Sequence, residues 1–207
     1  MKTITTTDTA FAADVIKGGG LVAVPTETVY GLAANGLDSD AVQKIYDVKG
    51  RPETKPISLL VSGLEDAKRF CADIPEAAYV LAEKFWPGPL TMIFWRNESV
   101  PSIVTAGGDT IGVRCPDHAM TLELISKAAV PLAAPSANMS GMSSPKNAGS
   151  VLDYFDGKID CVLDGGQCSV GIESTIVDMT SWPPKIIRQG GLEKDKLTKA
   201  LGMEVLL

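Results

Sequence analysis

Residues 47–58 read Asp-Val-Lys-Gly-Arg-Pro-Glu-Thr-Lys-Pro-Ile-Ser and combine three cations with one glycine and two prolines. Because glycine and proline interrupt a regular helix, we expect one short, stiff loop here. That loop would carry Lys49, Arg51 and Lys55 together, and the apolar run 57–61 predicts a buried strand directly after it. These residues alone are consistent with a phosphate clamp and with an ordinary solvated basic loop.

The rest of the chain alternates predicted strands and helices, without a linker or an internal repeat. Apolar runs and period-two patterns predict strands at 21–24, 57–61, 90–95, 110–114, 131–135, 161–163 and 185–188. Residues 171–178 are predicted to pass from a glycine loop into an alternating strand. Capping residues, glycine stops and helical spacing predict helices over about 8–17, 39–46, 64–70, 75–86, 119–129, 146–155 and 192–201. Strands alternate with helices in the first half, and strand-to-strand steps become more frequent later. The prediction is a single α/β domain with a twisted, mixed parallel/antiparallel sheet flanked by helices.

The composition limits the classes of function. The 207 residues are large for one domain and small for two, and 45% of them are hydrophobic, enough for a sizeable core. A net charge of -6 argues against a broad basic face for nucleic acid, although a local basic groove stays open. Because the chain as a whole is acidic, the cluster of cations in residues 49–55 is a stronger indication of a local anion site.

The cysteines and the N-terminal sequence concern the cellular compartment. The four cysteines are far apart and the chain has a single histidine, which argues against a structural zinc site or a disulfide framework. The first residues contain no apolar leader segment, and no apolar run approaches the length of a membrane span. We therefore expect a cytoplasmic protein that makes no contact with a membrane.

Two polar stretches follow predicted strands. Residues 25–31 include Thr28 and Tyr30, and they read either as the lining of a small-ligand site or as a hairpin or strand continuation. Residues 136–145 place Ser136 and Asn138 on one side, and they read either as a plain loop or as a second polar wall facing the cation loop. The alternatives stay open for both stretches.

Arg114 ends the predicted strand 110–114, where apolar Ile111 and Val113 face the other way. It reads either as a surface residue on an edge strand or as a planar fork for a carboxylate or phosphate in a cleft. The sequence contains no phosphate loop, no Gly-x-Gly-x-x-Gly and no Gly-x-Ser-x-Gly motif. Any nucleotide would therefore be held by cations and hydroxyls, and catalysis would proceed by positioning and charge neutralisation.

Six motifs in a fixed order resemble the YrdC family: residues 25–32, 49–52, 87–91, 114–116, 135–138 and 174–178. The resemblance implies one YrdC-like catalytic domain over residues 1–207, with no additional C-terminal domain. It also implies a nucleotidyltransferase that makes threonylcarbamoyl-adenylate and pyrophosphate from L-threonine, bicarbonate and ATP. The product would serve the threonylcarbamoyladenosine (t6A) modification of tRNA.

The resemblance also implies roles for individual residues. Catalysis is assigned to Lys49 and Arg51. ATP binding is assigned to Lys49, Arg51, Lys55, Thr110, Ser136, Asn138, Ser144 and Arg188. Threonine binding is assigned to Thr28, Tyr30, Arg114, Ala134 (through its backbone) and Ser174. Some family members carry a histidine near the end of the strand after the clamp, where this chain has Leu60, so a threonine contact of Leu60 stays open.

The implied cofactor is Mg²⁺ bound with ATP, and no residue is assigned as a metal ligand. The implied partners are a transient threonylcarbamoyl transferase and, through a weak contact, RNA. Two other functions stay open on the sequence. A non-catalytic RNA-binding module would bind with strong salt dependence. A related enzyme that uses carbamoyl phosphate would turn over ATP without an amino acid.

Overall fold

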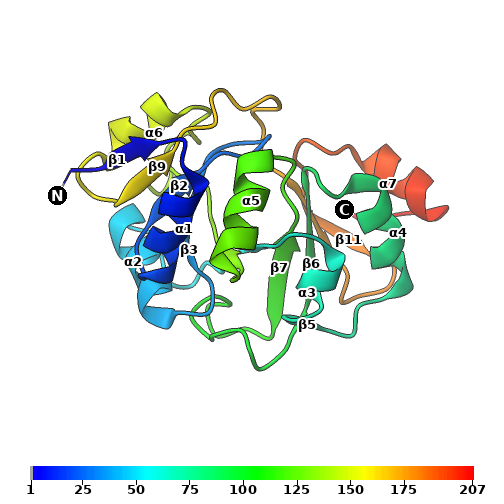
Figure 1. The fold of residues 1–207 in the computed structure, drawn as a ribbon. Helices are drawn as coiled ribbons and strands as arrows, with labels where there is room; N and C mark the ends of the chain where they lie inside the picture. The colour runs from blue at the N-terminus through cyan, green and yellow to red at the C-terminus, as the bar shows by residue number, and fades with distance from the viewer. Residues whose placement is uncertain (1) are drawn as a thin grey trace.

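One mixed sheet of eleven strands runs through residues 2–207, which the computed structural model describes (Figure 1). Ten strands lie in the order β1-β9-β2-β3-β8-β4-β7-β6-β10-β11, and β5 pairs with β6 beside this path. The strands are β1 Ile4–Thr6, β2 Val22–Val24, β3 Gly31–Asn35, β4 Leu59–Leu60, β5 Cys71–Ala72, β6 Leu90–Arg96, β7 Thr110–Arg114, β8 Leu132–Ala133, β9 Cys161–Leu163, β10 Thr175–Asp178 and β11 Lys185–Arg188. Parallel pairs such as β4–β7 and antiparallel pairs such as β6–β7 both occur, so the predicted mixed sheet is confirmed.

Helices cover both sides of this sheet. They are α1 Thr9–Lys17, α2 Ser39–Lys49, α3 Leu64–Ala67, α4 Glu76–Phe85, α5 Ala119–Ala128, α6 Ala148–Phe155 and α7 Lys194–Leu201. Asp8 and Asp38 accept hydrogen bonds from the first backbone N–H groups of α1 and α2. Among residues 2–207, every helix is too short or too polar to span a lipid bilayer.

The alternation of side chains along the strands divides the apolar residues between the two faces. On β2, Ala23 belongs to the core on one face, whereas Val22 and Val24 belong to the core on the other. The first core is covered by α2, α4, α6 and α7. The second core is smaller and is covered by α1 and α5, which lie side by side in front of the sheet in Figure 1. On the second face, α1 and α5 therefore cover only part of the sheet and, in the described part of the chain, leave the rest without a helix.

The predicted elements differ from the observed ones mainly at their ends. The strand expected at 57–61 is limited to Leu59–Leu60, and the strand expected at 131–135 is limited to Leu132–Ala133. The predicted passage from a glycine loop into a strand within 171–178 is confirmed, with the strand at Thr175–Asp178. Strands β1, β3 and β5 were not predicted. β1 and β5 are only three and two residues long, and β3 is a run of mostly small residues without a clear period-two pattern. The polar stretch 25–30 is an irregular connection between the antiparallel strands β2 and β3.

The prediction that Lys49 shares one loop with Arg51 and Lys55 is wrong. Helix α2 continues through Lys49, and Gly50 ends it in the left-handed conformation with φ 57°. That conformation suits glycine, which has no Cβ to collide with the backbone. The two prolines come only after this stop, so they do not shorten the helix.

Lys49 lies inside the protein, with 2% of its surface exposed. Its ammonium Nζ donates to the backbone carbonyls of Ser136, at 2.6 Å, and of Asn138. Burial, followed by the nearby Arg51, lowers the pKa of Lys49 to about 8, so the group is still mostly protonated at neutral pH. The lysine therefore fastens the polar loop that begins at residue 136 to the end of α2.

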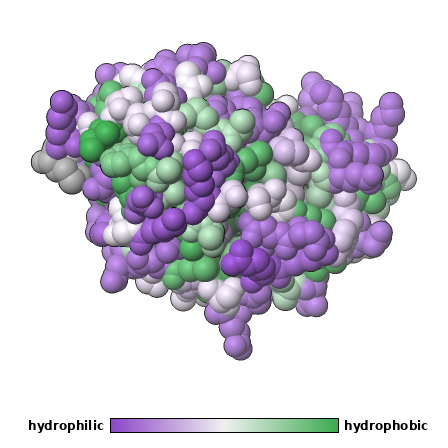
Figure 2. All heavy atoms as spheres, viewed as in Figure 1, coloured by the Kyte–Doolittle hydropathy of each residue, from purple (hydrophilic) through white to green (hydrophobic). Residues whose placement is uncertain are grey.

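The outer surface is mostly polar. Figure 2 shows hydrophobic residues in small patches between hydrophilic ones on the face seen in Figure 1. The most exposed large apolar side chains include Met142, Trp182 in the turn between β10 and β11, and Ile187 on β11. Single apolar residues of this kind are normal on a protein surface.

Lys49→Met should lower the free energy of unfolding by about 2–4 kcal/mol, because two buried carbonyls lose their donor while the aliphatic chain is kept. Urea unfolding measures this change. Lys55→Met is the matched control, since Lys55 is exposed, and its stability should equal that of the wild type. A Lys49→Met protein as stable as the control would contradict the fastening role.

Candidate functional site

A cavity of about 190 Å³ lies on the partly covered face of the sheet. Its floor is a row of side chains that crosses five neighbouring strands. Register places Leu60 of β4 beside Arg114 of β7, Thr91 of β6 beside Ile176 of β10, and Ile176 beside Arg188 of β11. All five residues line the cavity. The floor is therefore built from rigid strands, which hold side chains in place better than loops do.

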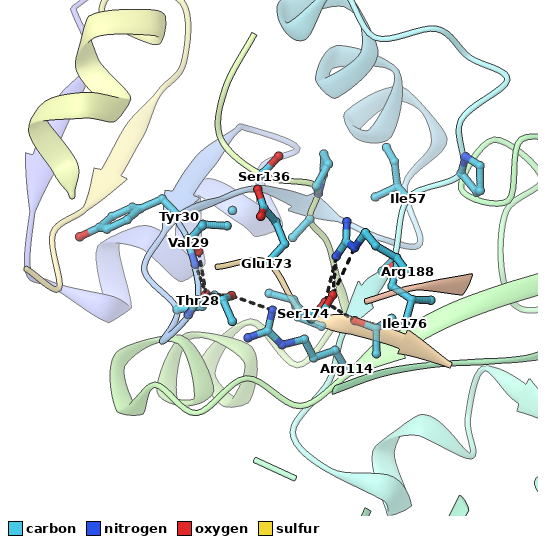
Figure 3. Close-up of a pocket in the computed structure, with 18 of the residues that line it drawn as sticks. Thr28, Val29, Tyr30, Ile57, Arg114, Ser136, Glu173, Ser174, Ile176 and Arg188 are labelled. Carbon is cyan, nitrogen blue, oxygen red and sulfur yellow. Dashed lines mark hydrogen bonds between the residues drawn. The ribbon is translucent and has the colours of Figure 1, made fainter. Parts of the chain in front are cut away.

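Loops form the walls of the cavity. They come from four segments that are distant in sequence: the connection after β2, the loop after α2, the segment after β8 and the residues before β10. The wall residues are Thr26, Thr28, Val29, Tyr30, Gly31, Arg51, Pro56, Ile57, Ser58, Ala134, Pro135, Ser136, Glu173 and Ser174. Figure 3 shows Thr28, Ser136, Ser174 and Arg188 surrounding the same space.

Arg114 is buried in the floor, with 7% of its surface exposed. Its Nη2 lies 2.7 Å from Glu27 Oε2, its Nη1 donates to Thr28 Oγ1 at 2.9 Å, and its Nε donates to the Gly88 carbonyl at 3.1 Å. Strand β7 lies between β4 and β6, so the interpretation of Arg114 as an edge-strand residue is wrong. Arg114 instead lines the cavity from a central strand.

Arg188 approaches the cavity from the last strand. Its Nε and Nη2 donate to the Ser174 carbonyl at 3.2 and 2.8 Å, and Nη2 also donates to Ser174 Oγ at 3.2 Å. Ser174 Oγ in turn lies 2.8 Å from Thr91 Oγ1, with either hydroxyl as donor. Figure 3 shows Arg188 and Arg114 on either side of Ser174. Two guanidinium groups are thus fixed along the floor of the cavity.

The loop after α2 brings a third guanidinium to the cavity. Arg51 donates from Nε and Nη2 to the carbonyls of Lys55 and Pro56, at 3.2 and 2.9 Å, and this curls the loop around its side chain. Burial lowers the pKa of Arg51 and of Arg188 from the ordinary arginine value, yet both stay cationic at neutral pH.

Three arginines and one carboxylate, Glu173, are the charged residues among those that line the cavity. Glu173 Oε1 accepts a hydrogen bond from Ser144 Oγ at 2.6 Å, which joins the loop after residue 136 to the segment before β10. This hydrogen bond is the largest cause of the lowered pKa of Glu173. Burial acts in the opposite direction and offsets part of the effect. The excess of positive charge suits anionic ligands such as carboxylates and phosphates.

The structure places several of the predicted site residues away from the cavity surface. Lys49 is buried behind the wall, Lys55 is exposed, and Thr110 lies at the opposite end of β7 from Arg114. Asn138 accepts from Ser136 Oγ through Oδ1 at 2.5 Å. Of the three cations in residues 49–55, only Arg51 lines the cavity.

Tyr30 lines the cavity, but its hydroxyl points away from it in Figure 3. The hydroxyl donates to the Gly166 carbonyl at 2.9 Å and accepts from Gly165 N–H at 3.1 Å. Burial raises its pKa to about 12, so it stays protonated. A direct contact between Tyr30 and a ligand would consequently involve its backbone.

Sequence reasoning missed Thr91, Ile176 and Glu173 as parts of the site. Thr91 alternates with the core residues Leu90 and Met92 on β6, which is a signal that it faces the other side. Glu173 directly precedes a predicted site residue in a short glycine-led segment. Nothing in the sequence pattern identifies it as the carboxylate that meets Ser144.

Glu27→Gln should lower the free energy of unfolding by about 3–5 kcal/mol, because the buried guanidinium of Arg114 would lose its compensating charge. Urea unfolding measures this loss. Glu65→Gln is the control, since Glu65 pairs with Lys68 on the surface and its removal should leave stability unchanged. Equal stabilities of the two variants would contradict the importance of the buried pair.

Comparisons with known proteins agree with this architecture. The family model described as Telomere recombination, for Sua5, YciO and YrdC proteins, matches residues 14–190. Curated relatives named threonylcarbamoyl-AMP synthase are 48% identical in Pyrococcus abyssi, over 92% of this chain, and 40% identical in Bacillus subtilis, over 93% of it. The chain spans about half the length of these relatives, 56% of each.

A solved structure resembles the whole fold. The crystal structure of P. abyssi Sua5 complexed with L-threonine superimposes with a TM-score of 0.96 and 43% identity, covering 100% of this chain and 63% of that one. The six ordered motifs, the shared fold and the matched residues lead to one conclusion: the chain belongs to the Sua5/YciO/YrdC family.

Proposed function

We propose that the chain is a threonylcarbamoyl-AMP synthase, a nucleotidyltransferase that converts L-threonine, bicarbonate and ATP into threonylcarbamoyl-adenylate and pyrophosphate. The observation that carries this proposal is the cavity lined by three guanidinium groups and a single carboxylate. The names of the relatives and the threonine complex of the P. abyssi protein support the same substrates. The product would supply a transferase that makes t6A in tRNA, and the reaction would take place in the cytoplasm.

The threonine carboxylate is assigned to Arg114. Its planar guanidinium matches a carboxylate better than a lysine point charge does, and Glu27 and Thr28 fix its orientation. Thr28 and Ser174 offer hydroxyls beside it, while Ala134 and Tyr30 offer backbone groups. This part of the cavity would hold the amino acid next to Leu60, whose side chain lies in the adjacent strand.

The phosphates of ATP are assigned to Arg51, Arg188 and Ser136, which line the cavity. Lys55, Thr110 and Ser144 would contact parts of ATP that extend beyond it. Lys49 and Asn138 would act by holding the Ser136 segment in position. The catalytic role proposed for Lys49 is consequently one of positioning, and that of Arg51 is direct charge neutralisation.

The chemistry explains why cations are needed. The threonine amine and bicarbonate combine to a carbamate with loss of water, and a carbamate oxygen attacks the α-phosphorus while the bond to the pyrophosphate oxygen breaks. Both reactants are anions, so fixed guanidinium groups lower the cost of their approach and of the charge on the leaving group. Mg²⁺ bound with ATP would add positive charge to the phosphates, and the oxygen donors of the cavity suit such a hard cation.

Arg51→Ala should slow pyrophosphate release about 10²-fold or more, as the loss of one preorganised donor to a developing charge does in other enzymes. The assay contains ATP, Mg²⁺ and bicarbonate, with and without L-threonine. Arg69→Ala is the matched control, because Arg69 pairs with Asp66 outside the cavity, and its activity should equal that of the wild type.

The same assay separates the alternatives. Release that needs threonine supports the synthase and argues against an enzyme that takes carbamoyl phosphate. Near-normal activity of Arg51→Ala would contradict the phosphate assignment. No release by the folded wild type under any combination would favour the RNA-binding module, whose affinity would fall steeply with salt.

A further inference from the structure

We propose that Glu173, together with the hydroxyl of Ser144, is the protein's ligand for the Mg²⁺ that enters with ATP. This assignment rests on the proposed function and concerns the same cavity. It gives a role to the one carboxylate among the cavity-lining residues and to its contact with the opposite loop.

The position of Glu173 needs an explanation, because it is a half-buried anion in the lining of a cavity whose other charged residues are arginines. It precedes Ser174, to which Arg188 is bonded, and the charges of Arg188 and Lys146 also act on it. The hydrogen bond from Ser144 stabilises its ionised form. A carboxylate here would repel a triphosphate held by Arg188, unless a cation lies between the two anions.

A divalent cation satisfies both anions at once. Mg²⁺ prefers oxygen ligands and commonly binds through one or two carboxylates plus the phosphates of its nucleotide. A hydroxyl and a carboxylate that share one Mg²⁺ with nucleotide phosphates are also found in phosphate-loop enzymes. Here the Ser144 hydroxyl and the Glu173 carboxylate already lie 2.6 Å apart, and one carboxylate oxygen is left for another partner.

The rest of the chain indicates that the cation would need the nucleotide. Within residues 2–207, no group of three or more histidine, cysteine, aspartate or glutamate side chains could hold a metal ion. One carboxylate and one hydroxyl are too few ligands for a six-coordinate ion without phosphate oxygens. We therefore expect Mg²⁺ alone to bind weakly, and Mg²⁺ and ATP each to tighten the binding of the other.

The test is calorimetric titration of ATP into the protein with excess Mg²⁺ and with a chelator. In the wild type, Mg²⁺ should tighten ATP binding about 10- to 100-fold, and Glu173→Gln should remove most of this gain, as lost metal-site groups do elsewhere. With the chelator, Glu173→Gln should bind ATP as tightly as the wild type or more tightly, because the repulsion is gone. Ser144→Ala should reduce the gain in part.

Glu53→Gln is the matched control. Glu53 is an exposed carboxylate that accepts from Gln43 Nε2 outside the cavity, and the variant should keep the full effect of Mg²⁺. A second readout uses Mn²⁺ in place of Mg²⁺. The water-proton relaxation produced by bound Mn²⁺ and ATP should change in Glu173→Gln and stay as in the wild type in Glu53→Gln.

The outcomes are distinct. A Glu173→Gln protein that keeps the full Mg²⁺ gain and the wild-type Mn²⁺ signal would overturn the assignment. A variant that binds ATP more tightly by the same factor with and without Mg²⁺ would overturn it too, since Glu173 would then act by repulsion alone. A folded wild type that binds no ATP under either condition would overturn the proposed function and, with it, this assignment.

Discussion

The charge of Arg114 is the constraint around which the site is arranged. A guanidinium that is 93% buried is costly unless every side of it meets an acceptor or a counter-charge, and here the acceptors come from segments far apart in sequence. Glu27 and Thr28 belong to the connection after β2, and Gly88 belongs to the turn before β6. Glu27 also accepts from the backbone of Asp117 after β7, at 3.1 Å. One buried cation thus aligns three segments and leaves the cavity ready-made, which lowers the ordering cost of binding.

The two faces of the sheet have different roles: one packs against the main core and the other lines the cavity. One face is closed by helices over a continuous core, which supplies the stability of the domain. The other is closed by α1 and α5 over part of its width, and the remaining strands carry Arg114, Thr91 and Arg188 toward the cavity. Because successive residues alternate between the faces, β6 and β7 contribute to core and site at once. Substitution on one face is therefore separable from substitution on the other.

Local sequence signals were sufficient for much of the fold. The pair of capping residues Asp38 and Ser39 predicted the start of α2, and the alternation in Thr110–Arg114 predicted a strand, because capping and side-chain period depend on neighbouring residues. The end of α2 was predicted too early, because residues 47–58 were interpreted as one loop, whereas the helix continues through Lys49 and only Gly50 ends it. Strand pairing depends on distant residues, so the central position of Arg114 could not be read from its own strand.

For the site, too, the sequence predicted which residues take part better than it predicted contacts between distant segments. The resemblance brought together Arg51, Arg114, Ser136 and Arg188, and the structure does place them around one cavity. It could not show that Lys49 bonds to the loop at 136 or that Glu173 meets Ser144. Both contacts join segments separated by 29 residues or more, and neither follows from spacing.

The floor of the cavity also has a consequence for synthesis of the protein. Its row of residues begins on β4, at residue 60, and ends on β11, at residue 188, so its last member is among the final residues of the matched region to leave the ribosome. Pairings between such distant strands are slow to form. A nascent chain that has not passed Arg188 therefore lacks one side of the floor.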